Sequence, residues 1–148
     1  MMTSSDGDGV PNFIRDLTPE RFEVVFQLVK EIHLVPQSIG VAFGWESNDI
    51  DALQGAFRDV RGQLKDIPSA RVRIVASGAS FATPRQLDEA SGEADGNTLF
   101  LLVPERLARG WGRFMEEAIS LLGPRELFLR TGYQRDEIWA AVQDLAQS

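Results

Sequence analysis

Residues 98–103 have the sequence TLFLLV, and PERLARGWGRFMEEAISLL follows at 104–122. Nearly every position of the first segment is apolar, which is typical of a strand buried on both faces at the centre of a parallel sheet. Proline begins the second segment, and Gly123 and Pro124 end it, as expected of a helix. Its apolar positions recur at helical spacing and predict the buried face: Leu107, Trp111, Phe114, Ala118, Leu121 and Leu122.

Predicted strands and helices alternate along the rest of the chain. Short runs rich in β-branched or aromatic residues predict further strands at 38–44 (SIGVAFG), 71–76 (RVRIVA) and 126–130 (ELFLR). Capping residues predict where the other helices begin: at Thr18, at Ser47 or Asn48, at Thr83, and at the acidic pair 136–137.

This alternation predicts an α/β fold of a definite kind. We expect a three-layer αβα sandwich with a mainly parallel four-stranded sheet, flavodoxin-like or Rossmann-like, and an extra N-terminal helix. The main alternative is an α+β domain in which one edge strand runs antiparallel. The length of 148 residues predicts a single α/β domain over residues 13–148, preceded by a disordered lead-in at residues 1–12.

Composition restricts the compartment and the chemistry. The chain has no cysteine, which excludes a disulfide framework, a thiolate metal site and a cysteine nucleophile. No secretory signal is visible at the N-terminus, and no apolar run reaches the roughly 18 residues of a membrane span, so we expect a cytoplasmic protein. Thirteen Arg against two Lys, with frequent Ala, Gly and Asp, suggest a GC-rich bacterial genome.

The net charge of −7 indicates the kind of partner. Nucleic-acid binding needs an excess of Lys and Arg that is absent here, whereas an acidic surface favours a basic protein partner. Solubility alone would also account for the charge. The acidity is concentrated in the second and third predicted helices, which supply the candidate partner-binding residues: Asp49, Asp51, Asp59, Asp88, Glu89, Glu93 and Asp95. A second copy of the chain is a further candidate partner, through a predicted edge strand at 71–76.

Catalytic motifs are not found. His33 is the only histidine and lies near the end of the first predicted helix, far in sequence from the predicted strand-end loops. The GxSxG, GxGxxG and GxxxxGK[ST] patterns do not occur. Carboxylates at 46, 49 and 51 are better explained by the dipole of the helix that they begin than by a magnesium site. We therefore expect a non-catalytic binding module without cofactor or metal, such as an immunity protein, an antitoxin or a regulatory adaptor.

A nucleotide or small-molecule site at the carboxyl ends of the strands is the alternative. In open α/β sheets, ligands usually bind beyond these ends. The loops predicted there contain polar and aromatic residues that could line such a site: Trp45, Glu46, Ser47, Ser77, Ser80, Arg106, Trp111 and Arg130.

One region resembles Toll/interleukin-receptor (TIR) domains. In VPERLARGWGRFMEEA, Trp111 precedes Glu116 and Glu117 after a predicted strand, similar to the strand–loop–Trp–Glu region of that family, and AFGWESND falls about where the family begins. The resemblance implies a degenerate NAD-cleaving or signalling domain in which a glutamate serves in cleavage. Trp111 and Glu116 are one position further apart than in the family, Pro104 and Glu105 replace the expected serine, and one strand–helix unit is missing.

Overall fold

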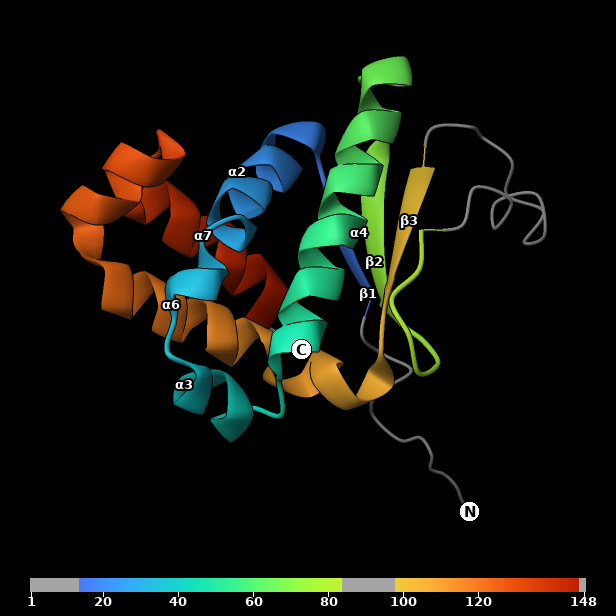
Figure 1. The fold of residues 1–148 in the computed structure, drawn as a ribbon. Helices are drawn as coiled ribbons and strands as arrows, with labels where there is room; N and C mark the ends of the chain where they lie inside the picture. Colours follow the sequence, from blue (N-terminus) through green and yellow to red (C-terminus); the bar gives the residue numbers. More distant parts are fainter. Residues whose placement is uncertain (1–13, 84–97, 147–148) are drawn as a thin grey trace, which may run out of the picture.

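The computed structural model describes residues 14–83 and 98–146 (Figure 1). The predicted lead-in at 1–12 and the helix predicted after Thr83 lie outside these residues. Three strands form one sheet: β1 (Ile14–Leu17), β2 (Arg71–Ala76) and β3 (Thr98–Val103). The helices are α2 (Pro19–Val29), the 3-10 turn η2 (Ile32–Leu34), α3 (Gln37–Ala42), α4 (Ser47–Asp66), α6 (Glu105–Thr131) and α7 (Arg135–Ala146).

The sheet is mixed and has three strands, so the prediction of a mainly parallel four-stranded sheet is wrong. Its order is β1-β2-β3; β2 pairs with β3 in parallel, but β1 pairs with β2 antiparallel. β3, expected at the centre, lies at an edge, and β2, expected at an edge, is paired on both sides. The segment 71–76 therefore offers no free edge to a second copy of the chain. The α+β alternative with an antiparallel edge strand is closer to the structure.

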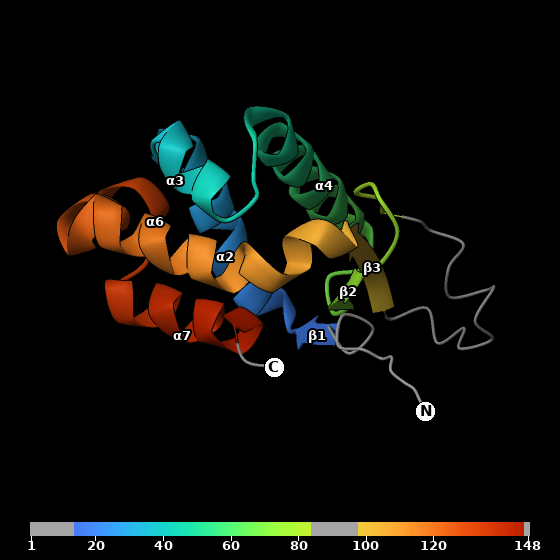
Figure 2. The same cartoon turned by 90° about the horizontal axis from the view of Figure 1, so that it is seen from below.

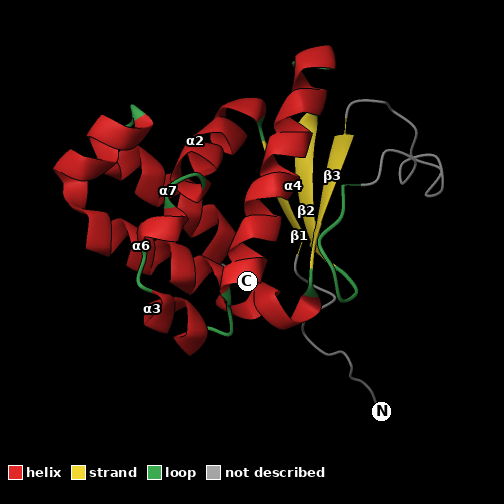
Figure 3. Cartoon of the chain, in the orientation of Figure 1, coloured by secondary structure: helices red, strands yellow, loops and turns green. Residues whose placement is uncertain are grey.

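The described helices cover one face of the sheet, which gives two layers in place of the predicted three (Figures 1, 2 and 3). Val72, Ile74 and Ala76 of β2 are buried against the helices, as are alternate residues of β3. On the outer face, Arg73 forms a bidentate ion pair with Asp16 directly opposite on β1, at 2.7 and 3.2 Å. The arginines of β2 thus belong to the face that points away from the described helices.

Two predicted strands are helical. The segment 38–44 forms α3 and a turn, in which the Trp45 N–H donates to Gly40 O at 2.8 Å. A Cβ on Gly40 would lie 3.3 Å from Trp45 O, so this glycine permits the close turn. The segment 126–130 continues α6 beyond a kink at Gly123, whose φ of +76° suits glycine. Arg130 pairs with Glu126 at 2.9 Å, an i,i+4 contact that supports the helix over a strand.

Four predicted helices are confirmed in type and approximate position. Thr18 caps α2 by accepting from the Arg21 N–H at 3.2 Å. The helix predicted at 104–122 is the first part of α6, and the last predicted helix is α7. α4 begins where expected, but its cap is Glu46, which forms a capping box with Asp49. β1 was not predicted, because a strand of four residues with two charged side chains has no clear periodicity.

Aromatic rings connect the helices in the core. Phe57 of α4 stacks on Phe22 of α2, with ring centroids 5.0 Å apart and planes 8° apart. Phe57 also contacts Trp111 of α6 edge-on, with ring centroids 6.1 Å apart and planes at 75°. All three side chains are fully buried. A second contact, between Trp45 and Phe114 at 5.4 Å, fixes the start of α4 against α6.

Gly62 and Gly110 test this packing because both are helical but have opposite surroundings. A Cβ on Gly62 would meet no atom within 4 Å, whereas a Cβ on Gly110 would lie 3.0 Å from Phe43 O. We expect Gly62→Ala to raise the free energy of unfolding by about 1 kcal/mol, through helix propensity. Gly110→Ala should lower it, since α6 would have to move away from Phe43. Urea denaturation measures both; an equal gain in the two variants would contradict the close approach.

Candidate functional site

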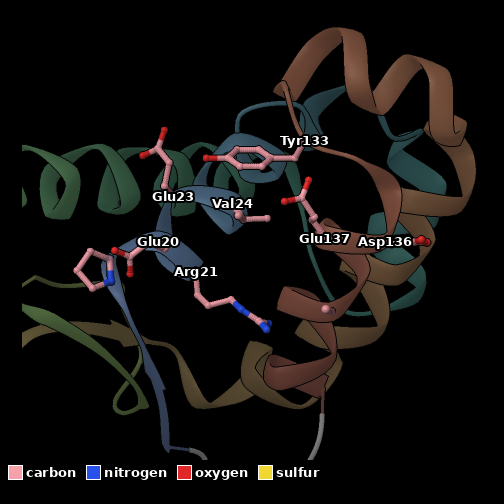
Figure 4. A pocket seen from close by; sticks show the side chains of 9 residues that line it. Glu20, Arg21, Glu23, Val24, Tyr133, Asp136 and Glu137 are labelled. Carbon is pink, nitrogen blue, oxygen red and sulfur yellow. The ribbon is translucent and has the colours of Figure 1, made fainter.

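A groove with a volume of about 780 Å³ lies between α2 and α7 (Figure 4). The first turns of α2 form one wall with Pro19, Glu20, Arg21, Glu23 and Val24. The other wall consists of Tyr133, in the turn after α6, and of Asp136, Glu137 and Ala140 on α7. Four carboxylates and one guanidinium therefore surround a partly apolar floor.

The turn between α6 and α7 positions Tyr133. Gly132 ends α6 with a φ of +83°, the left-handed conformation that favours glycine. The Thr131 hydroxyl donates to Leu127 O at 2.6 Å and accepts from the Tyr133 N–H at 3.1 Å. Figure 4 shows the Tyr133 side chain extending from this turn toward α2, with Glu23 near its hydroxyl end and Glu137 beside the ring.

The electrostatic surroundings of Tyr133 are acidic. Burial raises the pKa of the Tyr133 phenol, and the charges of Glu23 and Glu137 raise it further, while Arg61 acts in the opposite direction. The Tyr133 hydroxyl forms no hydrogen bond within the described part of the chain. The groove therefore presents a neutral aromatic ring between negative charges.

Glu23 and Glu137 differ in what they bind. Glu23 accepts two hydrogen bonds from Arg61, at 3.0 and 3.1 Å, and one from Gln27 at 2.7 Å. The Arg61 guanidinium also lies over the Phe26 ring, 4.7 Å from its centroid. Glu137 accepts only the Gln134 N–H, at 3.0 Å through Oε1, among the described residues. The negative charge of Glu23 is thus balanced by Arg61, whereas Glu137 forms no ion pair with any of the described residues.

Of the acidic residues predicted to bind a partner, Asp49 is already engaged in contacts within the protein. Asp49 has a side chain that is 12% exposed; it accepts from the Glu46 N–H at 2.9 Å and pairs with Arg106 at 2.7 Å. It therefore holds the starts of α4 and α6 together. Asp51 and Asp59 are exposed on α4, where Asp59 accepts from the Thr83 hydroxyl. Asp88, Glu89, Glu93 and Asp95 lie outside the described residues.

The residues predicted to line a strand-end site are not gathered around one cavity. Trp45 and Trp111 are fully buried in the core. Arg130 lies in the last turns of α6 and pairs with Glu31 and Glu126. Ser77 and Ser80 lie in the loop after β2, and Arg106 is held by Asp49. Trp45, Glu46 and Ser47 do line a smaller cavity of about 290 Å³, together with His33, Val35, Gln37, Ile50 and Asp51.

The structure does not contain the sheet that the TIR resemblance implies. Residues 42–49 form the end of α3, a turn and the start of α4, in place of a first strand. Glu116 accepts from Gln143 of α7 at 2.7 Å, so it joins two helices. Glu117 is exposed. Trp111, which precedes both glutamates in the sequence, is buried in the core.

Sequence reasoning missed the groove, because its two walls are about 110 positions apart in the chain. Two local signals were present: acidic residues at i and i+3 in α2, and an acidic pair at the start of α7.

In the part of the chain that the structure describes, no three His, Asp or Glu side chains gather closely enough to hold a metal ion. The described helices include none with the length and apolarity of a membrane span. No protein-family model, curated protein or solved structure matches the chain.

Tyr133 reports directly on the charge of the groove, because it is the only tyrosine of the chain. We expect Glu137→Gln to lower the pKa of Tyr133 toward the ordinary value of 10.0, since a negative charge is removed. Arg61→Gln should raise it, since a positive charge is lost. Ultraviolet absorbance of the phenolate follows a single titration in each variant. Shifts of the same sign in both variants would contradict the described geometry.

Asp49 provides a test of the contact between α4 and α6. Burial raises its pKa, but hydrogen bonds from Arg106 and the Glu46 N–H, and the charge of Arg106, together hold the pKa below its ordinary value of 3.8. We expect Asp49→Ala to lower the free energy of unfolding by about 1 kcal/mol from the lost cap. The stabilisation is present above pH 3.8 and is lost as the pH falls through the lower folded pKa. Asp51→Ala, on the same helical turn, is the control in urea denaturation.

Proposed function

We propose that the chain is a non-catalytic bacterial binding module of the cytoplasm that holds a basic segment of a partner protein between α2 and α7. An immunity protein, an antitoxin or a regulatory adaptor would fit this description. One observation carries the proposal: the groove is large, and four of its five charged lining residues are acidic. Opposite charges on two partners favour their encounter and suppress binding to the wrong partner.

The floor of the groove favours a peptide over a nucleic acid. Val24, Ala140 and Pro19 offer apolar surface beside the carboxylates. Lys and Arg carry a charged group on an aliphatic stem, so one side chain can contact both kinds of surface. A nucleic acid would bring phosphates against Glu20, Asp136 and Glu137, which repel them.

The smaller cavity at the start of α4 supports a second candidate function, the binding of a small molecule. Three residues of the predicted strand-end site, Trp45, Glu46 and Ser47, line it. Glu46 and Asp51 are acidic and disfavour the phosphates of a nucleotide, so an uncharged or cationic molecule suits this cavity better. Thermal shift against nucleotides and amines distinguishes the two chemistries, because a bound ligand raises the melting temperature.

Binding of labelled twelve-residue peptides tests the main proposal. We expect an arginine-rich peptide to bind, with affinity falling as salt rises, and a glutamate-rich peptide of the same length not to bind. The triple variant Glu20→Gln, Asp136→Asn, Glu137→Gln should bind about tenfold more weakly. Exposed ion pairs contribute roughly 0.2–1 kcal/mol each, and 1.4 kcal/mol corresponds to a factor of ten.

A matched control separates the groove from the charge of the whole protein. Glu105→Gln, Asp66→Asn and Glu117→Gln remove the same number of negative charges from exposed positions elsewhere. We expect this variant to keep the affinity of the unaltered chain within twofold. Equal losses in the two triple variants, or no binding of the basic peptide by the unaltered chain, would overturn the proposal.

A further inference from the structure

We infer that the groove anchors its partner by one arginine side chain, which stacks on the Tyr133 ring and pairs with the Glu137 carboxylate. This inference rests on the proposed function and deepens it. It identifies the residue type that the partner must present and the two side chains that recognise it.

The chain already contains this arrangement once, around Glu23. There the Arg61 guanidinium lies 4.7 Å from the centroid of the Phe26 ring and forms two hydrogen bonds with Glu23, at 3.0 and 3.1 Å. An aromatic face and a carboxylate thus hold a guanidinium together. Such a ring attracts a cation through its quadrupole, and the planar guanidinium fits the ring and the carboxylate at the same time.

Tyr133 and Glu137 repeat the pair of an aromatic ring and a carboxylate on the groove side (Figure 4). Both line the groove, and the charge of Glu137 acts on the Tyr133 phenol and raises its pKa. No guanidinium of the described residues lies over the Tyr133 ring. The nearby Arg135 is directed to Trp139, with its guanidinium 5.3 Å from the ring centroid. The position that Arg61 fills beside Phe26 is therefore open to a side chain from outside.

The hydrogen bonds that Glu137 and Tyr133 can still accept favour arginine over lysine. Glu137 accepts the Gln134 N–H through Oε1. Its Oε2 accepts no hydrogen bond from the described residues and can bind a ligand. The Tyr133 hydroxyl, which forms no hydrogen bond with the described residues, can accept one from a ligand. A guanidinium has five N–H donors in one plane and can serve the carboxylate and the hydroxyl while it stacks; an ammonium group is a compact point charge that cannot stack.

The experiment compares arginine and lysine peptides of equal length and charge on the full chain. We expect the arginine peptide to bind at least threefold more tightly than the lysine peptide. Tyr133→Phe should retain this preference because the ring remains, whereas Tyr133→Leu should abolish it. Replacing arginine with the uncharged isostere citrulline should weaken binding at least tenfold.

A second measurement needs no variant. Tyr133 is the only tyrosine, so ring-¹³C-tyrosine labelling gives one set of NMR signals. We expect these signals to shift on addition of the arginine peptide and to stay in place with the citrulline peptide.

The outcomes separate the inference from the proposed function. If peptide binding depends on the groove carboxylates but shows no arginine preference and leaves the tyrosine signals unmoved, the arginine anchor is overturned and the proposed function stands. If no basic peptide binds at all, both are overturned. Loss of the preference in Tyr133→Phe as well as in Tyr133→Leu also counts against stacking.

Discussion

The stack of Phe22 on Phe57, together with the edge-on contact of Phe57 with Trp111, is the contact on which the arrangement of the helices depends. The three residues come from α2, α4 and α6, so one buried aromatic group fixes three helices against one another. The sheet has only three strands and is covered by described helices on one face. A single layer of helices must therefore form most of the core by packing on itself as well as on the strands. Large aromatic side chains supply much of the buried area that this requires.

The groove follows from this packing. α2 is fixed by Phe22 on its inner side, and its first turns therefore present Glu20, Arg21 and Glu23 away from the core. α7 packs along α6 through buried Ile138 and Val142, which places its acidic first turn opposite α2. Both walls present charges because both are the first turns of helices, where carboxylates are favoured by the helix dipole. A feature that stabilises each helix separately thus becomes a shared negative surface once the helices pack.

The sequence predicts local structure well where periodicity is strong and fails where a distant contact decides. Leu53, Phe57 and Val60 recur at helical spacing, and α4 buries all three. The segment 38–44 has the composition of a strand, but Gly40 lies against Trp45 and Phe114, which no local pattern reveals. Apolarity in 98–103 correctly predicts a strand yet places it at the centre of the sheet, because burial of both faces does not specify neighbours. The groove joins residues from opposite ends of the chain and could not be predicted without the packing.

β1 runs directly into α2, with Thr18 alone between them. The strand is short and pairs with β2 across 57 positions of the chain, as between Asp16 and Arg73, so its docking closes a long loop. Short edge strands of this kind are among the first parts of a protein to open. One wall of the groove is therefore attached to a segment that we expect to open more readily than the rest of the sheet. We expect a partner that holds α2 in place to stabilise the docked form of β1 and to slow hydrogen exchange at its amides, although these are not among the atoms that it touches.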